Sequence, residues 1–176
     1  ICRYKMYFGD KGGVTVSGGE PLLQPSFVGE LFRLLHGEGI HTALSTSGVW
    51  ADWDGACQVL DHTDLILGDL KFATPEEYRL HCKADMEKPL AFYRLAEERG
   101  IPLWVRHVVV PGLNDSLEDM GKIKVLAESF SNLEKIEWLP FHNLCVEKYQ
   151  SLGIPFPLAG TDNMDEEALQ RLVDSL

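Results

Sequence analysis

The chain has 176 residues, of which 45% are hydrophobic, and a formal net charge of −11. This length and composition suit one domain with a substantial core, and the negative charge repels phosphate backbones, so we expect no nucleic acid partner. The sequence contains no apolar run of membrane-spanning length and no signal-peptide pattern, so we expect a cytoplasmic protein with no membrane partner.

Short β-rich runs alternate with stretches of helical periodicity along the chain. The predicted strands are 13–17, 41–46, 64–70, 103–110 and 133–139. The predicted helices are 26–37, 54–60, 87–99, 116–129 and 165–176, with a further helix beginning at Thr74. The expected buried face of the helix 26–37 consists of Phe27, Leu31, Leu34 and Leu35.

Five strand–helix units in succession indicate an α/β fold, with a parallel sheet and helices outside it. The order of the elements leaves open whether the sheet is doubly wound or part of a barrel. No linker or low-complexity tract interrupts the pattern, so we expect residues 1–176 to form a single domain.

The cysteines are scattered along the chain. They are Cys2, Cys57, Cys82 and Cys145. No two of them form a C-x-x-C pair, so the sequence predicts no metal site and indicates reduced, structural thiols.

Polar and charged residues gather where the predicted strands end. They lie in Ser17-Gly18-Gly19-Glu20, Ser45-Thr46-Ser47-Gly48, Asp69-Leu70-Lys71, Arg106-His107 and Pro140-Phe141-His142-Asn143. Because the carboxyl ends of parallel strands meet at one edge of a sheet, we expect these residues to line one ligand site. The alternative is that strand ends meet loops, which are polar in any fold. That alternative explains one cluster well but the whole charged set less well.

Several of these residues have two interpretations. Gly18 and Gly19 let a ligand approach the backbone, and Glu20 offers a carboxylate to an ammonium group, yet a tight turn also needs glycine. Asp69 and Lys71 point to the same side of a strand, where they either pair with each other or bind a zwitterionic or ribose-bearing ligand.

Two further positions, Arg106 and His142, also have two interpretations each. Arg106 lies within the apolar run 104–110, where it requires either a structural carboxylate or a ligand as its partner. His142 follows the run 139–141, and a lone histidine in a loop is most often structural or solvated.

Five segments of the chain carry a family resemblance. They are Thr15–Gln24, Gly39–Gly48, Asp64–Lys71, Trp104–Gly112 and Lys135–His142. In this order they resemble the activating enzymes of pyruvate formate-lyase and related glycyl radical enzymes. The match spans most of the chain, and five ordered blocks are more specific than any single one.

The resemblance implies a radical S-adenosylmethionine (radical SAM) enzyme on a partial (β/α) TIM-like barrel. It implies a [4Fe-4S] cluster, reduced by a protein such as flavodoxin, that splits S-adenosylmethionine into methionine and a 5′-deoxyadenosyl radical. That radical takes a hydrogen from a glycine of a partner enzyme such as pyruvate formate-lyase. The protein's part is to orient the reactants and exclude water.

The family's cofactor-binding positions carry over onto this sequence. They are Gly18, Gly19, Glu20, Thr46, Asp69, Lys71, Arg106 and His142. Gly18, Gly19 and Glu20 match the segment that holds the methionyl amino group. Thr46 and Asp69 match polar positions that include a monovalent cation site. Lys71, Arg106 and His142 match contacts to the carboxylate, ribose or adenine region. No residue is assigned a catalytic role. Ser45 stands where the family has an acidic residue, which weakens the case for the cation.

A larger departure concerns the cluster itself. The family's C-x-x-x-C-x-x-C motif, which precedes its G-G-E block, does not occur in these 176 residues. A cluster needs thiolate ligands, and residue 1 is Ile rather than Met, so we expect a truncated part of a longer activase that is inactive alone. The alternatives are another radical SAM enzyme, such as an activase of anaerobic ribonucleotide reductase, and a cluster-free binding module.

Overall fold

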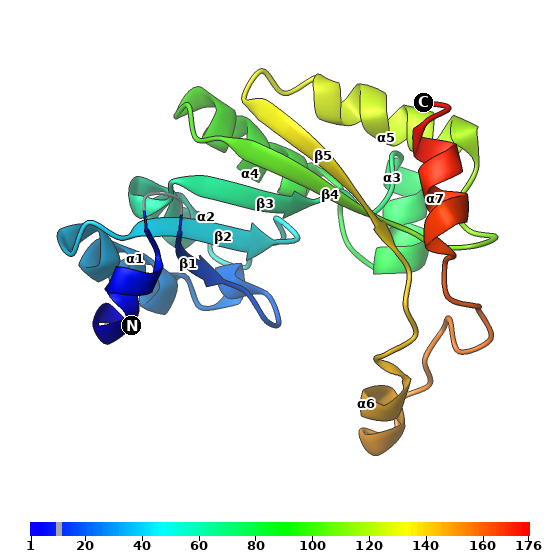
Figure 1. The fold of residues 1–176 in the computed structure, drawn as a ribbon, viewed down its shortest axis with the longest axis horizontal. Helices are drawn as coiled ribbons and strands as arrows, with labels where there is room; N and C mark the ends of the chain where they lie inside the picture. The colour runs from blue at the N-terminus through cyan, green and yellow to red at the C-terminus, as the bar shows by residue number, and fades with distance from the viewer. Residues whose placement is uncertain (10–11) are drawn as a thin grey trace.

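The five predicted strands form one parallel sheet in a computed structural model, which describes residues 1–9 and 12–176 (Figure 1). The strands are β1 (Gly13–Val16), β2 (His41–Thr46), β3 (Leu65–Asp69), β4 (Leu103–Val109) and β5 (Leu133–Pro140). They lie side by side in chain order. Each new strand therefore adds at the same edge, as in a β/α barrel. In a doubly wound sheet the strand order reverses partway, and later strands add at the opposite edge. The sheet is an open part of a barrel, and the predicted α/β class is confirmed.

Helices follow each of the strands, and most of them lie close to their predicted positions. They are α1 (Pro25–Gly37), α2 (Trp53–Val59), α3 (Pro75–Glu77), α4 (Glu87–Glu98), α5 (Leu117–Glu128), α6 (Val146–Ser151) and α7 (Glu166–Val173). The side chains of Thr74, Ser116 and Asp165 each accept a first-turn backbone N–H, which explains where α3, α5 and α7 begin. Within the described part of the chain, no helix combines the length and the apolar character that crossing a membrane requires.

Some helical segments do not follow from the sequence pattern. Among them are α6, the 3₁₀ segments at Cys2–Tyr7 and Pro21–Leu23, and a π-helical turn at Tyr78–Cys82. Figure 1 shows α6 standing away from the sheet, on a segment that leaves β5 and returns to α7. The base of that segment is closed by the Met164 N–H, which donates to the Phe141 carbonyl at 2.9 Å.

The buried face of α1 agrees only in part with the predicted one: Leu35 is buried and Leu31 is half-buried against the main core, as predicted. Phe27 and Leu34 are 65% and 53% exposed, whereas Val28, Phe32 and Leu35 are buried in the main core. Both sets have helical spacing, because the helix carries two adjacent apolar stripes. Helical periodicity does not show which stripe is buried. The packing of α1 against α2 and the sheet determines it.

Helices pack against one face of the sheet and leave the other face uncovered. Along β4, Leu103 and Val105 are fully buried, in the same core as Phe92 of α4 and Ile123 of α5. The positions between them are only half-buried. Since side chains alternate along a strand, Arg106 lies on the face that the helices do not cover.

A polar network joins the amino ends of β2 and β3. Asp64, just before β3, accepts a hydrogen bond from the Thr42 N–H at 2.8 Å and lies 2.9 Å from Nε2 of His36. Partial burial by itself raises the pKa of this carboxyl group, but the hydrogen bonds from Thr42 and His36 outweigh burial and hold the pKa below its usual value. The charged form of Asp64 therefore stabilises the fold.

The variant Asp64→Asn tests this network. Because the folded-state pKa is lowered, the stabilisation is present above the ordinary carboxyl pKa of about 4 and is lost as the pH falls through the folded value. We expect the variant to lose about 1 kcal/mol at a pH of about 7, a modest figure because solvent screens this partly exposed carboxylate. The loss should shrink toward zero near a pH of about 2.

Urea unfolding at both pH values measures the difference. The matched control is Asp162→Asn, since the Asp162 side chain is exposed, and it should change stability little at either pH. A deficit of Asp64→Asn that is the same at both pH values would contradict the ionised role of Asp64.

Candidate functional site at the carboxyl ends of the strands

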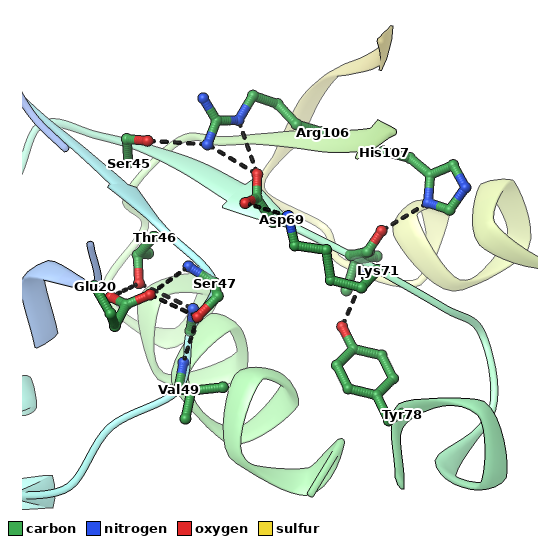
Figure 2. Close-up of polar contacts among 12 residues, drawn as sticks. Glu20, Ser45, Thr46, Ser47, Val49, Asp69, Lys71, Tyr78, Arg106 and His107 are labelled. Atoms are coloured by element: carbon green, nitrogen blue, oxygen red, sulfur yellow. Dashed lines mark hydrogen bonds and ion pairs between the residues drawn. The ribbon is translucent and has the colours of Figure 1, made fainter. Parts of the chain in front are cut away.

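The turn after β1 is tied to the end of β2 by the carboxylate of Glu20. Its Oε1 accepts hydrogen bonds from the Leu22 N–H at 3.1 Å and from the Thr46 hydroxyl at 2.5 Å. Its Oε2 accepts bonds from the Ser47 N–H at 2.8 Å and the Ser47 hydroxyl at 2.5 Å (Figure 2). We call Glu20, Thr46 and Ser47 the Glu20 cluster.

These four bonds change the interpretation of Glu20. A carboxylate has about four lone-pair sites, so the side chain is fully engaged by the protein. The carboxylate ties the turn around Glu20 to the end of β2 and adds negative charge there; its role toward an ammonium group stays a prediction. Gly18 and Gly19 form that turn with φ angles of +86° and +50°, which glycine adopts without strain. A Cβ at either position would meet open space.

A second group of polar residues lies on the uncovered face of β2, β3 and β4. The Asp69 carboxylate accepts bonds from Lys71 Nζ at 2.8 Å and from Arg106 Nε at 3.0 Å. Arg106 Nη2 also donates to the Ser45 hydroxyl at 2.9 Å (Figure 2). We call Ser45, Asp69, Lys71 and Arg106 the Asp69 cluster.

In the Asp69 cluster, Asp69 and Lys71 pair with each other, and Arg106 has a structural carboxylate as its partner, which are the ion-pair alternatives of the sequence. Asp69 and Arg106 are neighbours in the β3–β4 register, and their side chains are 20% and 21% exposed. One carboxylate faces two cations, so the cluster keeps a net positive charge. The Glu20 cluster is net negative, and the two clusters thus place opposite charges at adjacent strand ends.

Most of the predicted site residues come together at this edge. A groove of about 400 Å³ is lined by Glu20 and Ser47 from one cluster and by Lys71 from the other. His142 lies beyond the end of β5 and is exposed, and among the described residues no hydrogen bond or ion pair links it to either cluster. A larger groove, of about 570 Å³, runs between Ala73 and α5, and no predicted site residue lines it.

Two buried side chains hold the segment after β3 by its backbone. The Tyr78 hydroxyl accepts a bond from the Lys71 N–H at 3.1 Å, and His107 Nδ1 lies 2.7 Å from the Leu70 carbonyl (Figure 2). His107 Nε2 lies 3.1 Å from the Asn114 amide nitrogen. Burial lowers the pKa of His107, so its ring is neutral, donates to Leu70 and accepts from Asn114.

Sequence reasoning missed some of these residues. Strand alternation could have separated His107 from Arg106, because neighbouring residues of a strand face opposite sides. Tyr78 and Tyr93 lie in helical segments and give no sequence signal of a role at the site. Burial raises the pKa of Tyr78 to about 12 and that of Tyr93 well above its ordinary value, so both hydroxyls stay protonated.

Comparison with known proteins identifies the family of this chain. A model described as the radical SAM superfamily matches residues 3–122. The chain belongs to this superfamily. It is 37% identical to a pyruvate formate-lyase-activating enzyme of Clostridium pasteurianum, over 98% of this chain and 72% of that protein. It is 41% identical to the protein of that name from Staphylococcus epidermidis, over 97% of this chain and 70% of the relative.

Solved radical SAM structures share the fold. A domain of the pyruvate formate-lyase-activating enzyme of Bacteroides vulgatus superposes with a TM-score of 0.67 at 26% identity, over 92% of this chain and 91% of that one. A radical SAM methyltransferase of Sphaerobacter thermophilus superposes with a TM-score of 0.65 at 18% identity, over 92% of this chain and 47% of that one. The second match concerns the fold alone. The resemblance of the five segments to activating enzymes of pyruvate formate-lyase is confirmed, as is the partial barrel.

The cysteines of this radical SAM chain do not form a cluster site. Cys2 is exposed and the other three are half-buried. Burial raises the pKa of the Cys57 and Cys82 thiols, away from the thiolate form that binds iron. In residues 1–9 and 12–176, no three Cys, His, Asp or Glu side chains are placed to hold one metal ion. These residues therefore do not fit a [4Fe-4S] cluster.

The variant Glu20→Gln tests the role of the Glu20 cluster. Glutamine keeps one acceptor oxygen, but its NH₂ group cannot accept, so some of the four donors around Glu20 lose their partner. We expect a loss of about 1–3 kcal/mol in the free energy of unfolding, measured in urea. The control Glu128→Gln, at an exposed position of α5, should stay within about 0.5 kcal/mol of the wild type. Equal stabilities of the two variants would show that the four bonds do not brace the turn.

Proposed function

We propose that this chain is the S-adenosylmethionine-binding part of a radical SAM activase that forms a glycyl radical on a partner enzyme such as pyruvate formate-lyase. The observation that carries the proposal is the alignment with pyruvate formate-lyase-activating enzymes at 37% and 41% identity over nearly the whole chain. The gathering of seven of the eight family positions at one edge of the sheet supports it.

The charge arrangement suits the methionyl end of the cofactor, which carries an ammonium and a carboxylate group. In this proposal the open Gly18–Gly19 backbone and the negative Glu20 cluster bind the ammonium side. Lys71 and Arg106 bind the carboxylate or ribose side, because the Asp69 cluster is net positive. The groove of about 400 Å³ beside both clusters has the size of a typical small-molecule site.

The remaining family positions have supporting roles in the proposal. Thr46 holds Glu20, and Asp69 orients Lys71 and Arg106 through the ion pairs described above. His142 contributes to the adenine region, on a loop that is exposed in this structure. A monovalent cation beside Asp69 is disfavoured, because Arg106 already occupies the space between Ser45 and Asp69 with its own positive charge.

The chemistry of the reaction belongs to the cofactors. S-adenosylmethionine, when bound, supplies the radical chemistry by which the family removes a hydrogen atom from its partner. We propose that the [4Fe-4S] cluster is held by thiolates outside these 176 residues, and that a reductant such as flavodoxin serves the complete activase in the cytoplasm. The residues described here bind and orient the cofactor and keep water from it.

Binding of S-adenosylmethionine to the chain by itself tests the proposal. Hydrogen bonds contribute about 0.5–3 kcal/mol each after exchange with water, and association costs about 4–15 kcal/mol. We therefore expect a dissociation constant in the range of about 1 mM or weaker. Titration followed by ¹H–¹⁵N NMR should place the largest shifts at Gly18, Gly19 and Lys71.

A matched pair of variants makes the binding test specific. Lys71→Met should weaken binding about tenfold, the loss of one charge-assisted bond of about 1.5 kcal/mol. Lys122→Met, which removes an exposed lysine of α5 that pairs with Glu118, should leave binding unchanged. Shifts confined to other parts of the protein, or equal binding by both variants, would contradict the proposed site.

We further expect the chain alone to produce no 5′-deoxyadenosine. Its described residues offer no group of three ligands for a cluster, so no anchored iron site should form. The assay is anaerobic reconstitution with iron and sulfide, followed by dithionite and S-adenosylmethionine. Product that disappears when Cys57 or Cys82 is changed to Ser would show that these scattered thiols do assemble a cluster.

A further inference from the structure

The hydroxyl of Tyr93 lies between the ends of two strands that carry different parts of the site. It donates to the carbonyl of Thr46, the last residue of β2, at 3.2 Å. It lies 3.3 Å from the carbonyl of Asp69, the last residue of β3. A single buried proton is thus shared between the backbone of the Glu20 cluster and the backbone of the Asp69 cluster, as a three-centre hydrogen bond.

Two glycines make room for the Tyr93 ring. A Cβ added at Gly68 would lie 2.8 Å from Cε1 and Cζ of Tyr93, a distance that real contacts do not reach. A Cβ at Gly48 would lie 3.1 Å from the Tyr93 Cζ and 2.8 Å from Pro89. The ring therefore packs into a slot that a side chain at either glycine would obstruct, so both glycines hold the ring close to the two strand ends.

The helix that carries Tyr93 is itself fastened to the loop after β2. The Trp50 indole N–H donates to the Lys88 carbonyl at 3.2 Å, and Lys88 Nζ donates to the Trp50 carbonyl at 2.9 Å. The Lys88 ammonium also lies 4.7 Å from the centre of the Trp50 ring. These contacts fix the first turn of α4, five residues before Tyr93, against the segment that follows Thr46.

We infer that Tyr93 is a positioning residue, whose hydroxyl sets the spacing between the Glu20 cluster and the Asp69 cluster. Among the described residues, its hydroxyl hydrogen-bonds to the two strand-end carbonyls and to no side chain of either cluster. A zwitterionic ligand that spans both clusters requires their spacing to be fixed, since each end of the ligand is held by a different strand. This last step rests on the proposed function; the mechanical coupling of the two clusters does not.

The variant Tyr93→Phe removes the hydroxyl and keeps the ring in its slot. The matched control is Thr63→Val, which also deletes one buried hydroxyl, bonded to the Val59 carbonyl at 2.7 Å near the amino end of β3. Both variants should lower the melting temperature by a few degrees. Only Tyr93→Phe should speed amide hydrogen exchange at Ser47 and at Leu70, about tenfold at each.

A second measurement reads the coupling directly. In the wild type, the change Glu20→Gln should shift the amide resonances of Leu70 and Lys71, because Tyr93 links the two strand ends. In the Tyr93→Phe background the same change should leave those resonances in place. Exchange at Ser47 and Leu70 that rises equally in Tyr93→Phe and Thr63→Val, or shifts that persist without the hydroxyl, would overturn the inference.

The ligand measurement separates this inference from the proposed function. Tyr93→Phe should weaken the binding of S-adenosylmethionine about fivefold, and Thr63→Val should not weaken it. A wild type that binds no S-adenosylmethionine contradicts the proposed function, while the exchange data still decide the coupling. Equal binding by wild type and Tyr93→Phe overturns the positioning role and leaves the proposed function standing.

A measurement on the unaltered protein covers the case in which Tyr93→Phe does not fold. With tyrosine labelled by ¹³C at Cζ, a hydroxyl that is buried and bonded exchanges slowly with solvent. Tyr93 should then give separate Cζ signals for its protonated and deuterated forms in mixed H₂O and D₂O. A single averaged signal for Tyr93 would show that the shared hydrogen bond is not maintained.

Discussion

The Asp69 carboxylate, held between Lys71 and Arg106, is the interaction on which the site depends. All three groups are partly withdrawn from water, with the Asp69 and Arg106 side chains about four-fifths buried. An isolated charge at such depth is costly, and the loss of Asp69 would leave two neighbouring cations without their partner. The triad therefore depends on this carboxylate, and it leaves an excess of one positive charge beside a groove. A fixed cation at a strand end, with its geometry set in advance, is what recognition of a carboxylate requires.

Alternation along the strands divides the structural and the chemical tasks. On β4, Arg106 faces the uncovered side of the sheet, where it meets Asp69 and Ser45. Its neighbour His107 faces the helices, is 1% exposed, and holds the Leu70 carbonyl from behind. Tyr78 holds the next residue through the Lys71 N–H. The segment that carries Asp69 and Lys71 is thus braced by neutral, buried groups, which cost no charge burial, while the Lys71 side chain lines the groove.

The Glu20 cluster shows how a motif can serve binding without a free functional group. The four donors around the Glu20 carboxylate come from the turn that follows Glu20 itself and from the end of β2. They convert a negative side chain into a tie between two strands. What remains open at this place is the backbone of Gly18 and Gly19, whose left-handed φ angles exclude most other residues. The negative charge remains in place even though its lone pairs are engaged.

The sequence by itself determined the order of strands and helices, the parallel α/β class and the edge of the sheet at which the site lies. It could do so because hydrophobic period and cap residues act over a few positions, and because parallel strands bring their carboxyl ends together in any such fold. The family resemblance added the positions that are proposed to contact the cofactor.

Only the tertiary structure decided which groups meet at that edge. It chose one of two apolar stripes on α1, engaged Glu20 with hydroxyls that lie 26 and 27 residues away, and left His142 apart. It also brought the Tyr93 hydroxyl to the carbonyl of Thr46, which is 47 residues away in the sequence, in a slot that two glycines leave free. The physical reason is the same in each case. A hydrogen-bond partner or a packing slot is fixed by the relative placement of whole elements, and no local periodicity in the sequence records that placement.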